Sequence, residues 1–276
     1  MASGTAEQIT RASKSNLALA FVALPRTRRR DISVFYAFCR TVDDLADEPG
    51  LAEEERLSAL ERWRASLREE QPAEPPLAAQ VRALIAKYAL PLEHFSEIIA
   101  GCEMDVRGTF YETWAELRLY CHRVASVVGL VSIEIFGYTD AGCKTYATEL
   151  GLALQLTNIM RDIHEDYARH GRIYLPRTEM DEFGYDVGQL ALCTQSEAFR
   201  GLMEFQAARA RVFFQAALAA LPPTDRRAMV AAEIMRHSYE SLLGRMERDG
   251  FRVFTRRYRL SRWEKLRCVV RGRFGK

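Results

Sequence analysis

Two short stretches place carboxylates and amides at helical spacing within apolar surroundings. In Q-L-T-N-I-M-R-D-I-H-E-D (155–166), Asn158, Asp162 and Asp166 are four residues apart and share one stripe of a helix, with Gln155 on the same edge. The flanking residues are mostly apolar, which predicts a largely buried helix. An unpaired carboxylate in such an interior is costly, so these charges need a partner. The candidates are Arg161, bound protons, or a divalent metal that accepts hard oxygen ligands.

The stretch Y-A-F-C-R-T-V-D-D-L-A-D (36–47) repeats this pattern near the N-terminus. Asp43 and Asp47 are four residues apart, and Arg40 and Tyr36 continue the line one and two turns earlier. A single D-x-x-x-D motif is weak evidence, because many solvated helix faces contain one. Two such motifs, each on an apolar helix and each accompanied by an arginine, favour a metal site over two solvated acidic faces.

Composition predicts an ordinary globular protein in a reducing compartment. The 276 residues can form one substantial core, and no apolar run approaches the ~20 residues that span a bilayer. The six cysteines show no C-x-x-C pairing, and no signal segment precedes residue 13, so we expect free thiols and a cytoplasmic protein. The net charge is +2, yet the last 28 residues carry +8, which leaves −6 for the first 248.

Helical periodicity covers most of the chain, and no stretch alternates like a strand. We predict an all-α, single-domain bundle (1–276) of about eight to eleven helices around a central hydrophobic cavity, with residues 1–12 flexible. The two acidic helices should face each other across that cavity. The expected helices span residues 17–24, 27–47, 52–70, 77–88, 92–107, 113–136, 140–168, 194–221 and 224–248, followed by a basic segment, 251–276.

Acidic clusters converging on one pocket suit Mg²⁺, which prefers carboxylate oxygens and usually completes its shell with substrate phosphate. This predicts a phosphorylated substrate, whose remaining oxygens Arg40 and Arg161 could bind. A di-iron site is the main alternative, but the chain lacks Glu-x-x-His pairs. A polar metal lid over an apolar cavity fits an amphiphile with a diphosphate head and a hydrocarbon tail, and walls that exclude water protect an allylic cation.

Four motifs resemble the squalene/phytoene synthase family of head-to-head prenyltransferases over roughly residues 13–263. They are Y-A-F-C-R-T-V-D-D-L-A-D-E (36–48), G-C-E-M-D (101–105), Y-C-H-R-V-A-S-V-V-G (120–129) and L-Q-L-T-N-I-M-R-D-I-H-E-D (154–166) followed by G-R-I-Y-L-P. Within the family the chain is most similar to the bacterial presqualene diphosphate synthases of hopanoid pathways, through its first two motifs and V-S-I-E-I-F-G (131–137).

This resemblance implies an isoprenoid-synthase fold and a role for each motif residue. Two or three Mg²⁺ ions would be held by Asp43, Asp44, Asp47, Asn158, Asp162 and Asp166. Diphosphate or prenyl chain would contact Asn16, Tyr36, Arg40, Gln155, Arg161 and Tyr239, and Tyr120 would lie against the reacting centre. The sequence departs from the family at Ser126, which replaces a usual glycine and would crowd the cavity, and at S-K-S-N-L (13–17).

The implied reaction joins two farnesyl diphosphates into presqualene diphosphate. The close alternatives are a squalene synthase that continues with NADPH and a phytoene synthase that uses geranylgeranyl diphosphate. A non-catalytic member should have lost its acidic residues, and a terpene cyclase would not match all four motifs. The Arg/Trp/Phe mix of the basic segment suggests peripheral contact with an anionic membrane, against a solvated helix packed on the bundle. Nucleic acid is not expected, because no recognition module accompanies the charge.

Overall fold

Helices make up all the regular secondary structure in the described part of the chain, residues 20–108 and 110–274 of this computed structural model. This confirms the predicted all-α class. The elements are α3 (Arg26–Ala46), α4 (Glu53–Arg68), α5 (Ala78–Tyr88), α6 (Leu92–Val106), α7 (Trp114–Cys121), η1 (His122–Ser126), α8 (Val127–Phe136), α9 (Gly142–His170), α10 (Arg177–Glu182), α11 (Val187–Ala191), α12 (Glu197–Ala220), η2 (Pro223–Asp225), α13 (Val230–Arg248) and α14 (Arg262–Phe274).

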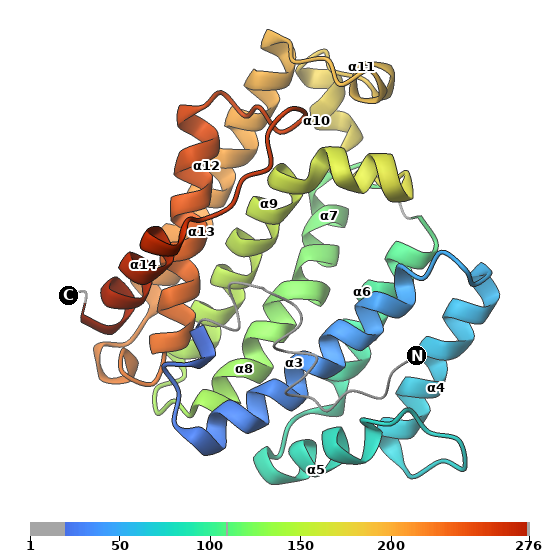
Figure 1. Cartoon of the computed structure of the whole chain (residues 1–276), viewed down its shortest axis with the longest axis vertical. Helices are drawn as coiled ribbons and strands as arrows, with labels where there is room; N and C mark the ends of the chain where they lie inside the picture. Colours follow the sequence, from blue (N-terminus) through green and yellow to red (C-terminus); the bar gives the residue numbers. More distant parts are fainter. Residues whose placement is uncertain (1–19, 109, 275–276) are drawn as a thin grey trace.

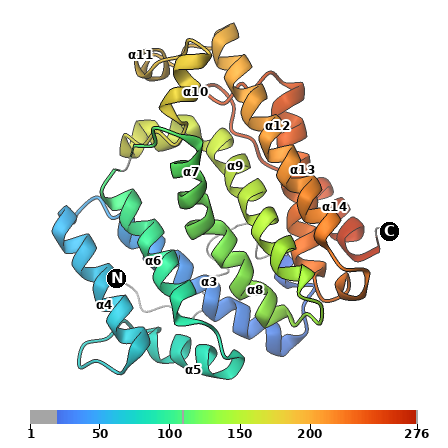
Figure 2. The ribbon, with the colours of Figure 1, turned by 180° about the vertical axis from the view of Figure 1, so that it is seen from behind.

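The long helix α9 runs through the middle of the bundle (Figures 1 and 2). It packs against α7, η1 and α8 on one side and against α12 and α13 on the other. Helices α3 to α6 pack against one another, and α3 and α6 also contact α8. The buried hydrophobic side chains of all these elements form one contiguous core, so the two acidic helices, α3 and α9, are held by the same packing.

Small residues allow α9 to approach the helix before it closely. A Cβ atom on Gly151 would lie 2.5 Å from the Cα of Ser126, and one on Gly129 would lie 2.8 Å from the carbonyl oxygen of Ala147. Close helix packing therefore requires these glycines, which also line the cavity described below. The Ser126 hydroxyl donates a hydrogen bond to the carbonyl oxygen of Thr148 at 2.8 Å and does not line the cavity described below. The expectation that Ser126 crowds the cavity was therefore wrong.

The predicted helix over 113–136 is interrupted by a π-helical turn, η1, between α7 and α8. Such turns often mark functional sites, and here Val124 and Ala125 of η1 line the cavity. Residues Trp114–Phe136 have a mean hydropathy of 1.4 and are long and apolar enough to cross a bilayer, contrary to the sequence prediction. Their packing against α6 and α9 in the bundle accounts equally well for this composition.

Three other segments differ from the prediction. Most of the expected helix 17–24 lies outside the described residues. The short helices α10 and α11 were not predicted, because five or six residues are too few to show a periodicity. After α13 the chain turns at Gly250 and Phe251, both with positive φ, and helix α14 begins only at Arg262.

Candidate active site

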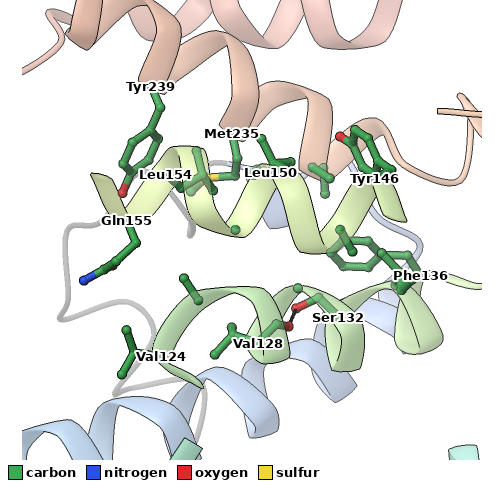
Figure 3. Close-up of a pocket in the computed structure, with 18 of the residues that line it drawn as sticks. Val124, Val128, Ser132, Phe136, Tyr146, Leu150, Leu154, Gln155, Met235 and Tyr239 are labelled. Carbon is green, nitrogen blue, oxygen red and sulfur yellow. Dashed lines mark hydrogen bonds between the residues drawn. The ribbon is translucent and has the colours of Figure 1, made fainter. Parts of the chain in front are cut away.

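An apolar cavity lies between α9, α8 with η1, and α13 (Figure 3). It encloses about 830 Å³ of space between protein atoms, its open mouth included. Phe136 and Tyr146 lie at one end of the view, and Gln155 and Tyr239 at the other. The remaining lining residues are almost all small or apolar: Ala20, Phe21, Val124, Ala125, Val128, Gly129, Ser132, Ile133, Ala147, Leu150, Gly151, Leu154, Asn158, Ala231, Ala232 and Met235.

Two residues of the α9 stripe, Gln155 and Asn158, belong to this cavity. The amide nitrogen of Asn158 donates to the Gln155 side-chain oxygen at 3.4 Å, whereas the buried Oδ1 of Asn158 has no hydrogen-bond partner. Such an orphaned acceptor carries a desolvation cost unless a ligand completes it. One and two turns further along α9, Asp162 and Asp166 continue the stripe away from the cavity, so the polar mouth joins the apolar walls without a break.

Two carboxylates of α3 pair with an arginine of the same helix. The Arg40 guanidinium contacts Asp43 at 3.1 Å and Asp44 at 2.5 Å, and all three side chains are about half exposed. Asp47 is the C-cap residue of α3, and its backbone N–H donates to the Asp43 carbonyl oxygen. On α9, Arg161 pairs with the adjacent Asp162, with its Nε 2.8 Å from Oδ1.

Arg172 and Asp105 connect the two acidic clusters. Helix α9 ends at Gly171, whose left-handed φ of 65° turns the chain back so that the Arg172 N–H donates to the Asp166 carbonyl oxygen at 3.2 Å. The Arg172 guanidinium then reaches Asp47 at 2.6 Å and Asp105 at 3.9 Å. Asp105 accepts hydrogen bonds from the hydroxyls of Tyr174 at 2.7 Å and Tyr120 at 2.9 Å.

Burial and mutual repulsion raise the pKa values of the clustered carboxyls. The pKa of Asp43 is raised to about 7, because the protein around the covered half of its side chain displaces water and the Asp47 charge repels it, while Arg40 opposes the rise. Desolvation raises the pKa of Asp166 to about 8, with Asp162 and then Asp105 adding to it. Asp105 has a pKa of about 6, since Arg172 and the two tyrosine hydroxyls partly offset its burial. The site therefore has more negative charge than its arginines neutralise.

This arrangement fits Mg²⁺ by its donor chemistry. A cation bound here would satisfy the Asn158 side-chain oxygen, which has no hydrogen-bond partner. It would also stabilise the ionised form of the carboxyls whose pKa values are raised, and all of these groups are hard oxygen donors. Within residues 20–108 and 110–274, however, no three His, Cys, Asp or Glu side chains are grouped closely enough to hold a metal by themselves. Substrate oxygens or water would have to complete each coordination shell, which is usual for Mg²⁺.

The structure brings most of the predicted site residues together. Tyr239 lines the cavity, and its hydroxyl interacts with the Arg161 guanidinium. Tyr36 lies one turn before Arg40 and packs edge-on against Phe21, which lines the cavity. Tyr120 lies in the tyrosine cluster around Asp105, stacked on Tyr174 with the ring centres 5.0 Å apart. Asn16 lies outside the described residues.

Sequence reasoning assigned no role to Asp105, Arg172 or Tyr174, although all three stand in the quoted motifs G-C-E-M-D and G-R-I-Y-L-P. Two features of the sequence could have identified them. Asp105 is an acid at the end of an apolar helix, and Arg172 and Tyr174 directly follow Gly171, a glycine that is expected to end a helix. The structure also accounts for the histidine that neighbours the stripe, since the His164 ring packs edge-on against Phe254.

Comparison with known proteins identifies the family of this chain. The model of the family described as squalene/phytoene synthase matches residues 10–264. The chain belongs to the squalene/phytoene synthase family. The members of this family are head-to-head prenyltransferases, so the prediction of family and fold from sequence motifs is confirmed.

Curated members of the family share about a third of their residues with the chain. Phytoene synthase of Arthrospira platensis is 35% identical over 95% of this chain and 89% of its own length. Phytoene synthase of Mycobacterium tuberculosis is 34% identical over 96% and 88%. Two solved structures are also similar. Squalene synthase HpnC of Alicyclobacillus acidocaldarius has a TM-score of 0.78 at 30% identity, covering 89% of this chain and 93% of that one. A dehydrosqualene synthase has a TM-score of 0.84 at 27% identity, covering 97% and 93%.

Proposed function

We propose that this protein joins two prenyl diphosphate molecules head-to-head in a Mg²⁺-dependent reaction that releases diphosphate. The observation that carries the proposal is the continuity between the acidic mouth and the apolar cavity. Gln155 and Asn158 line the cavity, and the same stripe of α9 continues to Asp162 and Asp166. A diphosphate at that stripe would have its hydrocarbon chain directed between α8, α9 and α13.

Each group has a distinct task in this reaction. Mg²⁺, held by Asp43, Asp47, Asn158, Asp162 and Asp166, with Asp44 beside them, would stabilise the negative charge of the departing diphosphate. Arg161 and Arg40 would exchange their present carboxylate partners for diphosphate oxygens, as planar bidentate donors do.

The cavity walls exclude water while the donor ionises to an allylic cation. The C2–C3 double bond of the acceptor then attacks C1 of the donor, and loss of one proton closes a cyclopropane ring. The acceptor keeps its own diphosphate in the product. Released diphosphate is the base in this scheme. Tyr120 and Tyr174 hold the carboxyl of Asp105 at the junction of the two helices.

Two chain lengths are candidates for the substrate, and different observations favour them. The curated relatives at 33–35% identity are named phytoene synthases, which favours geranylgeranyl diphosphate, and we take this C20 substrate as the first candidate. The solved structures at 30% and 27% identity are named squalene and dehydrosqualene synthases, which favours farnesyl diphosphate. That second candidate would give presqualene diphosphate, the product of hopanoid-type members, or squalene if NADPH is used.

The decisive experiment supplies each diphosphate separately. Purified protein is incubated with Mg²⁺ and labelled geranylgeranyl or farnesyl diphosphate, with and without NADPH, and products are extracted before and after phosphatase treatment. Two products support the first candidate. One is a cyclopropyl C40 alcohol after phosphatase treatment, and the other is a C40 hydrocarbon, which forms if the cyclopropyl diphosphate ionises in turn and releases its diphosphate and one further proton. A cyclopropyl C30 alcohol after phosphatase, or a C30 hydrocarbon, supports the second. Absence of any C30 or C40 product would refute the proposal, and the Asp162→Asn variant serves as the inactive control.

A further inference from the structure

Helix α14 presents an apolar stripe to solvent. Trp263, Leu266 and Val270 are 80%, 52% and 49% exposed. Their spacing of three and four residues places them on one face of the helix. Exposed apolar residues are ordinary when they are scattered, but a continuous stripe that includes a tryptophan marks an interaction surface.

The opposite face of α14 is fixed to the bundle. Cys268 is buried near Ser241, and a Cβ atom on Gly272 would lie 2.6 Å from a side-chain carbon of Ile234 on α13. At the start of the helix the Glu264 carboxylate accepts hydrogen bonds from the Ser261 backbone N–H and from Arg245 of α13. The stripe is therefore held outward by the packing of α14.

Cations flank the stripe on both sides. At 100° per residue, Arg267 and Arg271 lie along one edge and Arg262 and Arg273 along the other. Arg262, Arg267 and Arg271 form no ion pair with any residue in the described ranges. The one acid of the helix, Glu264, pairs with Arg245 of α13, so it does not offset the arginines beside the stripe.

A basic groove continues this surface beyond the end of α14. It meets the stripe at Arg273, which lies along one edge of the stripe, and it is further lined by Arg28, Arg226 and Arg227 and by Val22, which is 63% exposed. The acid in the groove, Asp225, is buried and accepts hydrogen bonds from the backbone N–H groups of Thr139 and Asp140 at 2.9 and 2.8 Å. It therefore does little to neutralise the arginines at the surface.

We propose that this surface, the α14 stripe with its flanking arginines and the adjoining groove, docks on an anionic lipid bilayer. Tryptophan and aliphatic side chains between arginines suit the interface, where rings and methyl groups enter the acyl boundary and guanidinium groups meet lipid phosphates. A soluble polyanion would leave the apolar stripe in water, and a second copy of the chain would bring two positive surfaces together.

Docking in this way would place one end of the apolar cavity next to the membrane. Phe136 lines the cavity, and the next residue, Gly137, lines the groove. Likewise Ala231 lines the cavity, and the preceding residue, Val230, lines the groove. A single layer of residues therefore separates the two spaces. Only this consequence rests on the proposed function, since a hydrocarbon product would form directly above the bilayer that receives it.

Vesicle binding by the full chain tests the proposal. Co-sedimentation is measured with vesicles of phosphatidylcholine alone and with vesicles of equal parts phosphatidylcholine and phosphatidylglycerol. Binding to the anionic vesicles only, weakened by added salt, is expected. Trp263 emission should shift to shorter wavelength and be quenched by brominated acyl chains, because Trp63 is buried and Trp114 is partly buried. Neutralising Arg267 or Arg271 should weaken binding about fivefold each.

Matched variants distinguish binding through this surface from non-specific binding to vesicles. Leu266→Glu should weaken binding about tenfold or more, whereas Leu192→Glu, at an 82% exposed site after α11, should not change it. Arg118→Gln on α7 is the control for Arg267→Gln. All four variants should keep the basal enzymatic rate with soluble substrate. Equal binding to neutral vesicles, equal effects of variant and control, binding to heparin but not vesicles, or a Trp263 shift that depends only on protein concentration would each overturn the proposal.

Discussion

Replacing Arg172 with glutamine should expose the charge imbalance of the site. Arg172 is 11% exposed and lies between Asp105, 9% exposed, and Asp47, 35% exposed. Breaking a buried ion pair by removing one partner costs about 3–5 kcal/mol. Since Asp47 can regain some hydration, we expect the lower end: Arg172→Gln should lower the free energy of unfolding of the metal-free protein by ~3 kcal/mol at pH 8.

The loss should shrink at lower pH. The Arg172 guanidinium lowers the pKa of Asp105, which is about 6 in the folded wild type against an ordinary value of 3.8. Without Arg172 the pKa of Asp105 rises further, so the variant gains a proton on this carboxyl as the pH falls, and it loses stability as the pH rises through that higher value. Near pH 5 the lost hydrogen bonds to the carbonyl oxygens of Ala46 and Asp105 and the lost contact with the partly exposed Asp47 should remain, together about 1–2 kcal/mol.

Chemical denaturation in the presence of EDTA, followed by circular dichroism at pH 5, 6.5 and 8, measures this effect. Arg169→Gln is the matched control, because Arg169 is 65% exposed and pairs with Glu165 at the surface. Exposed pairs contribute about 0–1 kcal/mol, so the control should change stability little at any pH. A loss for Arg172→Gln that is as small as that of the control, or equally large at pH 5 and pH 8, would refute the reasoning.

Three further predictions concern the metal, the protons and the packing. Asp162→Ala should lower kcat by roughly 10²–10³ in steady-state assays with saturating substrate, while Asn158→Ala should mainly raise the Mg²⁺ concentration needed for half-maximal rate, since its Oδ1 has no partner in the protein. Because the pKa of Asp166 is raised to about 8, the metal-free protein should lose stability as the pH rises from 4 to 8, and Mg²⁺ should raise the melting temperature more at pH 8 than at pH 6. Gly151→Ala should cost about 1–3 kcal/mol in denaturation experiments, because its Cβ would meet the Ser126 backbone at 2.5 Å.

Local sequence signals predicted the helices that carry the site almost to the residue. The expected spans 27–47 and 140–168 compare with Arg26–Ala46 and Gly142–His170. Helical period, capping glycines and prolines are encoded within a few residues, so a single sequence reveals them. The π turn η1 and the short helices α10 and α11 depend on tertiary packing, and no local pattern announces them.

Pairings between distant residues were the part that could not be predicted. The stripe on α9 follows from spacing alone, whereas the contact of Arg172 with Asp47 spans 125 residues and depends on the turn at Gly171. The same holds for Tyr120, which was expected beside the reacting centre because of the family resemblance. Its hydroxyl bonds to Asp105, a contact that requires α6 and α7 to be placed relative to each other.

The two ends of the cavity differ in charge. The acids of α9 follow Gln155 and Asn158 at one end of the cavity, and Asp47 at the end of α3 joins them through Arg172 and Asp105. The arginines of the groove lie one residue layer behind Phe136, at the other end. The first end would attract a divalent cation and, through that cation, a diphosphate, whereas the second end would attract an anionic bilayer. The chain's net charge of +2 does not reveal this separation, because it sums 39 basic and 37 acidic residues over the whole chain. An amphiphilic substrate would therefore enter such a cavity in one orientation only, with its phosphates in water and its hydrocarbon chain toward the membrane side.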